Sequence, residues 1–211
     1  MNSNDDKLVL GEKIELMTEK GSFFFRYAAL NGKEALIVEK NINEEKSIVL
    51  RIQSSCVLSE TFHTIDCDCS DQLSFSLDLI SKTNGIVIYE YDEGRGIGLA
   101  NKLKALIVQK EKKEDTAQAF KYLGFESDER NFKLPVEILK KLFSGYAIDI
   151  ITDNKKKVDA LRESGLIVRN IIPCVRCKND IVRKYLAEKR DALGHSLGKN
   201  IEINVQVNMK N

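Results

Sequence analysis

The stretch GIVIYEYDEGRGIGLANKLKA, residues 85–105, decides the fold class of this 211-residue chain. Residues 85–91 are an apolar, β-branched run of the kind found in buried strands, and residues 92–98 form a glycine-rich loop. From about Leu99 to Lys112 the apolar spacing predicts a helix. A strand that passes through a short loop into a helix is the building unit of an α/β domain.

The rest of the chain extends this pattern in both directions. Helices are expected over residues 70–82, 116–123, 135–143, 155–164 and 179–193, and further strands over 147–152 and 166–172. Ser70 is a plausible N-cap for the first of these helices, and Gly124 and Gly165 stand where glycine commonly ends a helix. Short apolar runs over residues 23–29, 34–38 and 47–53 predict strands near the N-terminus. We therefore predict a layered α/β/α domain with a mixed, largely parallel sheet and an N-terminal antiparallel strand addition.

Composition and charge narrow the possible partners. Apolar residues make up 43% of the chain, enough for a substantial core, and 33 Lys and Arg balance 32 Asp and Glu. Proteins that bind duplex nucleic acid usually carry a marked basic excess, so we expect no nucleic-acid partner and only local recognition of anions. No apolar run approaches the ~20 residues that cross a bilayer, and the polar N-terminus does not read as a signal peptide. We expect a cytoplasmic protein.

Three cysteines, Cys56, Cys67 and Cys69, form a C-x10-C-x-C cluster. An odd total of five cysteines argues against a disulfide framework, and thiolates are ligands that suit zinc. Three ligands leave one tetrahedral position for water, which is typical of a catalytic site. The alternative is that these are buried cysteines acting as small apolar side chains, although the neighbouring Asp66 and Asp68 argue against it. His63 could substitute for one ligand.

A second cysteine pair, Cys174 and Cys177, follows Pro173 with Arg176 and Lys178 beside it. This C-x-x-C could be a redox pair with a lowered pKa or half of a second zinc site. Since no partner pair is evident elsewhere, incidental or auxiliary metal binding is the favoured interpretation.

The loop over residues 93–98 (EGRGIG) could bind phosphate through its backbone amides and Arg95. The alternative is a tight turn with a solvated arginine. Asp128 and Arg130 read by default as a surface ion pair. Lysines 155–157 begin a helix, where they oppose the helix dipole; such a conflict often marks an anion site, although a solvated helix end competes with that reading.

Taken together, these segments resemble one family. Five of them resemble, in order and spacing, the motifs of GTP cyclohydrolase II: RIQSSC (51–56), CDCSDQL (67–73), EGRGIGLANKLKA (93–105), GFESDERNF (124–132) and TDNKKKV (152–158). The closing stretch, with Pro173, Tyr185-Leu186 and Leu193-Gly194-His195, continues the resemblance, which covers roughly residues 20–197. We expect a disordered N-terminus over 1–7, a catalytic domain of this type over 8–197 and a C-terminal tail over 198–211.

The resemblance also implies an activity. A member of this family would use one zinc ion per chain, with magnesium on the triphosphate, and would usually be a homodimer. It would convert GTP to formate, pyrophosphate and 2,5-diamino-6-ribosylamino-4(3H)-pyrimidinone 5′-phosphate, the first step of riboflavin biosynthesis. Zinc would be held by Cys56, Cys67 and Cys69. The nucleotide would be bound by Arg51, Gln53, Ser54, Ser55, Gln72, Glu93, Gly94, Arg95, Thr116, Thr152 and Lys157.

Asp128 would be the proton acceptor, and Arg130 would attack the α-phosphate. A guanidinium stays protonated up to about pH 12, and in this charged form it has no free lone pair for attack. Stabilising the α-phosphate is therefore a role that suits Arg130 better.

Several positions depart from the family pattern. Gln53 and Ser55 stand where His and Glu are expected, and Leu106 stands where a tyrosine is expected. Ser70 replaces a glycine, and Asp153 and Lys155 replace Asn and Pro. These changes concern base recognition and later proton transfers more than metal or phosphate binding.

Two alternatives therefore stay open. One is a divergent relative that stops at a formylated intermediate, or that acts on another nucleotide or base, as in uracil catabolism. The other is a non-catalytic nucleotide-binding regulator, which the presence of Asp128, Arg130 and the three cysteines argues against.

Overall fold

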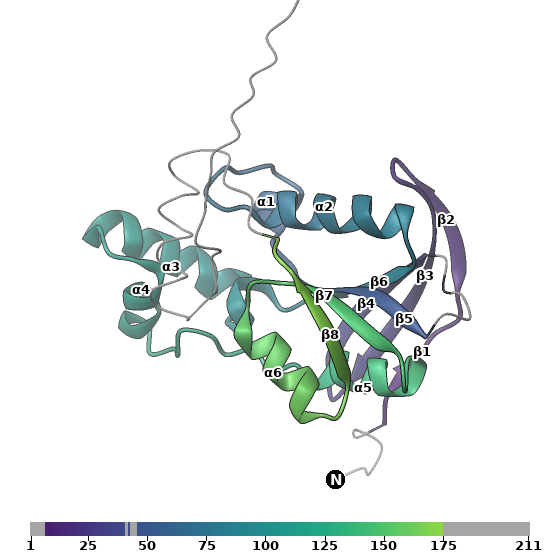
Figure 1. Ribbon diagram of the computed structural model, residues 1–211. Coiled ribbons are helices and arrows are strands. Elements are labelled where there is room, and N and C mark those ends of the chain that lie inside the picture. The colour runs from purple at the N-terminus through teal and green to yellow at the C-terminus, as the bar shows by residue number, and fades with distance from the viewer. Residues whose placement is uncertain (1–6, 41, 43–45, 175–211) are drawn as a thin grey trace, which may run out of the picture.

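The computed structural model describes residues 7–40, 42 and 46–174. In this part of the chain the strands form one mixed sheet with helices packed on both faces (Figure 1). The strands are β1 (Val9–Leu10), β2 (Ile14–Thr18), β3 (Gly21–Leu30), β4 (Lys33–Lys40), β5 (Ser47–Ser54), β6 (Gly85–Glu90), β7 (Ala147–Ile151) and β8 (Ile167–Ile172). The helices are α1 (Val57–Glu60), α2 (Cys69–Lys82), the 3-10 turn η1 (Glu93–Gly96), α3 (Gly98–Lys112), α4 (Thr116–Tyr122), α5 (Lys133–Leu142) and α6 (Lys155–Glu163).

The sheet has the order β1-β3-β4-β6-β5-β7-β8, with β2 paired to β3. Strands β6, β5, β7 and β8 are parallel, and the N-terminal strands join them through antiparallel pairs. This confirms the predicted α/β class with its antiparallel addition. Strands β1 and β2 were not predicted, because the apolar runs that signalled strands begin only at residue 23. The carboxyl ends of β5, β6 and β7 meet at one edge, where α/β sheets commonly bind ligands.

Side chains of β5 alternate between the two faces of the sheet. Ile48, Leu50 and Ile52 enter the core beneath α5 and α6, whereas Val49 belongs to the cluster on the α2 face. Because the side-chain period of a strand is two, Arg51 and Gln53 also lie on the α2 face. Both polar side chains are buried. Strand β5 therefore supplies apolar side chains to the core on one face of the sheet and polar side chains to the α2 face.

Helix α2 begins differently from our prediction. Asp68 is the N-cap and Cys69 the first helical residue, so the expected cap at Ser70 was wrong. The Ser70 amide donates instead to Ser59 Oγ at 3.1 Å. This contact between α1 and α2 ties the two cysteine-bearing segments together, a constraint that local sequence does not reveal. The glycine stops at Gly124 (φ 78°) and Gly165 (φ 80°) are confirmed.

Helices α3 and α4 form an arm beside the carboxyl edge of the sheet (Figure 1). The turn η1 leads into this arm with left-handed backbone at Gly94 (φ 64°) and Arg95 (φ 58°). A Cβ at Gly96 would lie 3.2 Å from the Arg130 amide nitrogen, so only glycine lets the two loops approach this closely. The Glu129 amide donates to the Arg95 carbonyl at 3.1 Å. The glycine loop is thus held against the loop that carries Asp128 and Arg130.

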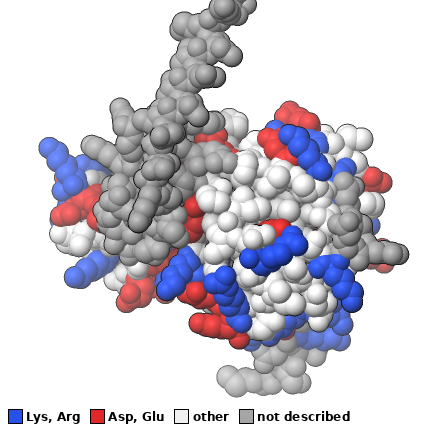
Figure 2. Space-filling view, viewed as in Figure 1, with Lys and Arg blue, Asp and Glu red and all other residues white. Residues whose placement is uncertain are grey.

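Charges on the visible face are mixed, with Lys and Arg interspersed among Asp and Glu (Figure 2). Among the described helices, none combines the length and the apolar character that a membrane crossing requires. The predicted helix over 179–193, the tail after residue 197 and Cys177 lie outside the described residues.

Candidate active site

A cavity of about 620 Å³ opens at the carboxyl edge of the parallel strands. Its volume lies within the range of small-molecule and cofactor sites. The predicted site residues come together here. The cavity is lined by Arg51, Gln53, Ser54, Ser55, Cys56, Cys67, Cys69, Gln72, Glu93, Gly94, Arg95, Thr116, Arg130, Thr152 and Lys157. Asp128 does not line it but is paired with Arg130.

The three cysteine sulfurs lie within 4.8 Å of one another, and Cys56 Sγ is 3.7 Å from Cys67 Sγ. Hydrogen bonds from the Cys56 and Cys69 thiols lower the pKa of Cys67 to about 2. His63 is exposed. It does not belong to the cysteine cluster, which is the possible metal site found among the residues that the structure describes. Three sulfur donors, one of them held as a thiolate, fit a zinc ion with one remaining position.

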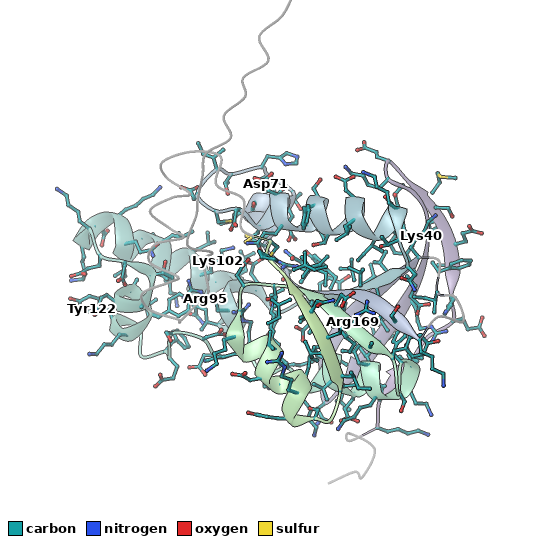
Figure 3. The ribbon with its side chains drawn as sticks, viewed as in Figure 1. Lys40, Asp71, Arg95, Lys102, Tyr122 and Arg169 are labelled. Atoms are coloured by element: carbon teal, nitrogen blue, oxygen red, sulfur yellow. The ribbon has the colours of Figure 1, made fainter. Side chains whose placement is uncertain are left out.

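Lys102 is a site residue that our sequence analysis missed. Its Nζ lies 3.1 Å from Cys56 Sγ and 2.6 Å from Glu93 Oε1. Burial opposes its charge, but the hydrogen bond to Glu93 and the charge of Cys56 outweigh that and raise the pKa of Lys102. Figure 3 shows Lys102 beside the sulfur atoms at the start of α2, with Arg95 nearby. The sequence did contain a signal for Lys102. This residue lies in the first turns of the helix that follows the glycine loop, and a side chain there can reach back to the loop.

Replacing Lys102 by methionine should weaken zinc binding about 10- to 100-fold, because the sulfur cluster loses a cationic hydrogen-bond donor. Competition with a chromophoric chelator measures this directly. Lys104→Met is the matched control, since Lys104 lies exposed on the same helix. Equal zinc affinity in the two variants would show that Lys102 does not support the cluster.

Glu93 supports the segment after the first cysteine. Its Oε2 accepts from the Val57 amide at 2.8 Å, while Oε1 accepts from Lys102. Both carboxylate oxygens therefore bind protein groups, which links the glycine loop to the cysteine segment.

Arg130 and Asp128 form a two-pronged ion pair. Arg130 Nε donates to Asp128 Oδ1 at 2.8 Å, and Nη2 donates to Oδ2 at 2.7 Å. Burial would raise the pKa of Asp128, but the hydrogen bonds and charge of Arg130 lower it. The third guanidinium nitrogen, Nη1, donates to Ser54 Oγ at 3.2 Å. The ion pair and the bond to Ser54 thus fix the position of the Arg130 guanidinium at the end of β5.

Lys157, from the first turn of α6, is buried and donates from Nζ to the Ile52 carbonyl at 2.8 Å. Burial lowers its pKa, and the charges of Arg130 and Arg51 lower it further. Glu90 lies close enough to interact with it, and burial raises the pKa of that carboxyl to about 7. A phosphate in the cavity would favour the charged form of Lys157.

Arg95 is held by the protein as well. Its Nη1 donates to the Ser127 carbonyl at 3.2 Å, and its guanidinium lies 5.6 Å from the centre of the Phe120 ring. Arg95 thus lies in a tight turn, but its partly buried side chain contacts the protein rather than solvent alone.

Cys174 is a second contact that the sequence did not predict. Its sulfur accepts from Arg51 Nη1 at 3.0 Å and lies 3.2 Å from Asp153 Oδ2. Burial raises the pKa of this thiol. Cys174 also lines the cavity. So do four positions that depart from the family pattern, Gln53, Ser55, Leu106 and Asp153.

Known proteins are similar to this chain over most of its described length. The GTP cyclohydrolase II family matches residues 11–173. The chain is 33% identical over 200 residues to GTP cyclohydrolase-2 of Histophilus somni (strain 2336), covering 93% of this chain and 92% of that one. It is 39% identical over 197 residues to GTP cyclohydrolase-2 of Buchnera aphidicola subsp. Schizaphis graminum, covering 92% of this chain and 100% of that one.

A longer relative is also similar. The chain is 34% identical over 190 residues to riboflavin biosynthesis protein RibBA of Endomicrobium trichonymphae, covering 88% of this chain. It spans only 47% of that protein. Among solved structures, RibBX, a two-domain 3,4-dihydroxy-2-butanone 4-phosphate synthase from A. baumannii, is a distant match, with a TM-score of 0.43, 15% identity and coverage of 82% of this chain and 42% of that one. From the extent of the family match and the near-complete alignment with two GTP cyclohydrolase-2 proteins, this chain belongs to the GTP cyclohydrolase II family.

Proposed function

We propose that this protein is a zinc-dependent hydrolase that opens the imidazole ring of GTP. The products would be formate, pyrophosphate and 2,5-diamino-6-ribosylamino-4(3H)-pyrimidinone 5′-phosphate, in the first step of riboflavin biosynthesis. The observation that carries the proposal is the convergence of the sulfur cluster, the Arg130 guanidinium and the phosphate-binding candidates on one cavity. Membership of the family supports it.

Cys56, Cys67 and Cys69 would hold the zinc ion. Their chemistry fits, because soft sulfur donors at this separation favour zinc over magnesium or calcium. When bound, zinc would supply Lewis acidity and an activated water for attack on the imidazole ring.

The chain's own residues would bind and orient the nucleotide. Arg95 and Lys157 would neutralise phosphate oxygens, with magnesium sharing that charge. Arg130 would stabilise the charge that develops at the α-phosphate, since a preformed cation costs little to reorganise during reaction. Asp128 would act as proton acceptor, and its lowered pKa keeps it ionised near neutral pH.

Mass spectrometry of the products tests the proposal. The zinc-loaded protein is incubated with GTP and magnesium, and formate and pyrophosphate are measured beside the nucleotide product. We expect all three products in equal amounts. Unchanged GTP in the presence of bound zinc would overturn the proposal.

A second candidate is a divergent enzyme that stops at a formylated intermediate or takes another nucleotide or base. The observation in its favour is Leu106, which lines the cavity where the family pattern has a tyrosine. A leucine cannot donate or accept a hydrogen bond, so a proton-transfer step loses one possible group.

Leu106→Tyr tests this candidate. If position 106 controls deformylation, the variant should shift the product mixture from formylated to deformylated nucleotide, as measured by mass spectrometry. Leu103→Tyr, at an exposed position of α3, controls for an added tyrosine. An identical product ratio in the parent and in both variants would count against a role for position 106.

We further propose that the protein forms a homodimer. We also propose that it is cytoplasmic and that it has no nucleic-acid partner. Exposed apolar side chains on the N-terminal strands, including Ile14, Leu16 and Met17, support an interface between copies. The use of unpaired thiols as ligands suits a reducing compartment. Light scattering after size exclusion measures the oligomeric state.

A further inference from the structure

Glu60, the last residue of α1, is a carboxylate for which the nucleotide and metal assignments give no role. It lies four residues after Cys56 and is partly buried. It accepts three hydrogen bonds: from Gln53 Nε2 at 2.7 Å, from Tyr89 OH at 2.5 Å and from the Cys56 amide at 3.2 Å. Both carboxyl oxygens of Glu60 therefore serve as acceptors for protein donors.

The network continues from Glu60 across the floor of the cavity. Gln53 Oε1 accepts from Arg51 Nε at 2.8 Å and from Arg51 Nη2 at 2.6 Å. These bonds and the bond to Glu60 fix which way the Gln53 amide points. Arg51 Nη2 also donates to Gln72 Oε1 at 2.7 Å, and Gln72 Nε2 donates to Asp68 Oδ2 at 2.6 Å.

Each of these bonds therefore runs from a donor toward one of two carboxylates. Arg51 Nη1 donates elsewhere, to the Ile151 carbonyl at 3.1 Å and to Cys174 Sγ at 3.0 Å. Glu60 follows the first cysteine, and Asp68 lies between Cys67 and Cys69. The Arg51 guanidinium lies between the two carboxylates. The network therefore connects both cysteine-bearing segments to the residues that line the cavity.

Tyr89 contributes through the sheet register. It pairs with Gln53 across β5 and β6, and so both side chains lie on the α2 face. Burial and the hydrogen bond to Glu60 raise the pKa of Tyr89, which keeps its hydroxyl protonated as a donor. The Tyr89 hydroxyl thus donates to Oε2 of Glu60, the same oxygen that accepts from the Cys56 amide.

We propose that Glu60 and Tyr89 are positioning residues that orient Gln53 and, through it, the Arg51 guanidinium in the lining of the nucleotide cavity. This inference rests on the proposed function. It explains why a glutamine at position 53 can serve where the family pattern has histidine, because Glu60 and Arg51 hold its amide in a single orientation.

The test uses the full-length chain with Glu60→Gln and Tyr89→Phe. Glu60→Gln places an amide donor among three donors, and we expect kcat/KM for GTP to fall about 100-fold, as misplaced substrate contacts can cost. Tyr89→Phe removes one hydroxyl, and we expect a loss of about 10-fold, because one hydrogen bond to a charged group is lost. Tyr27→Phe is the matched control, since Tyr27 OH donates to Glu34 at 2.6 Å on the exposed surface. It should leave kcat/KM unchanged.

A second measurement separates positioning from support of the metal. Calorimetry of GTP binding to the metal-stripped proteins needs no turnover, and we expect weaker binding in both site variants. Zinc stoichiometry in the metal-loaded variants should remain that of the parent. Parent-like kcat/KM and GTP affinity in Tyr89→Phe would overturn the proposal, as would a loss of activity that follows loss of zinc. If Glu60→Gln does not fold, Tyr89→Phe decides alone. A parent protein that binds GTP without opening it would refute the proposed function, while the calorimetry would still test positioning.

Discussion

Cys67→Ser is expected to abolish zinc binding and GTP ring opening together. The Cys56 and Cys69 thiols both hydrogen-bond to Cys67 and lower its pKa to about 2, which favours the thiolate form that binds zinc. A serine hydroxyl stays protonated at neutral pH and is a harder, weaker ligand for zinc. Since loss of an outer-shell partner alone costs ~10- to 100-fold in affinity, loss of a ligand should cost more than about 100-fold.

Zinc content and turnover are measured on the same preparation of this variant. Cys174→Ser is the control for zinc content, because Cys174 is a buried cysteine that contacts Arg51 and Asp153 rather than the cluster. It should retain the parent's zinc stoichiometry. Full zinc content and full turnover in Cys67→Ser would show that the ligand assignment is wrong.

Arg130→Ala is expected to lower kcat by about 100- to 1,000-fold, the range for removing one preorganised electrostatic contact. It should also destabilise the protein. The Asp128 side chain is only 1% exposed, and its salt-bridge partner would be gone. Removing one partner of a buried pair costs ~3–5 kcal/mol, because the remaining charge stays desolvated.

Two further variants separate these effects. Arg130→Lys retains a positive charge but loses the planar fork, so it should recover part of kcat if charge stabilisation is the role. The double variant Asp128→Ala with Arg130→Ala removes the orphaned carboxylate and should regain stability without regaining activity. Stability is followed by thermal unfolding. A parent-like kcat in Arg130→Ala would exclude this residue from the reaction.

Several features could be predicted because they are local. Apolar periodicity located the strands from residue 23 onward and most of the helices, since burial of one face imposes a period on nearby residues. The glycine stops at Gly124 and Gly165 followed from the left-handed backbone that ends a helix. The cap at Ser70 was wrong because Ser59, eleven residues earlier, engages the Ser70 amide.

The site residues also divide into those that local sequence could predict and those that it could not. Residue chemistry and spacing pointed to the three cysteines, Arg95 and lysines 155–157 as candidates, and the resemblance to a family supplied the roles of individual residues. Lys102 was missed because its partner Cys56 is 46 residues away. Cys174 reaches Arg51 across 123 residues. Such pairs depend on the order and register of the strands, which no local pattern contains.

The sequence by itself determined the alternation of strands and helices, the ligand chemistry of the cysteines and the family resemblance. These depend on short-range periodicity and on residue type. Only the tertiary structure decided which polar side chains share hydrogen bonds: Glu60 with Gln53 and Tyr89, and Lys102 with Cys56. The physical reason is that buried polar groups must find partners wherever the packed sheet and helices place them, and that placement is set by the whole fold.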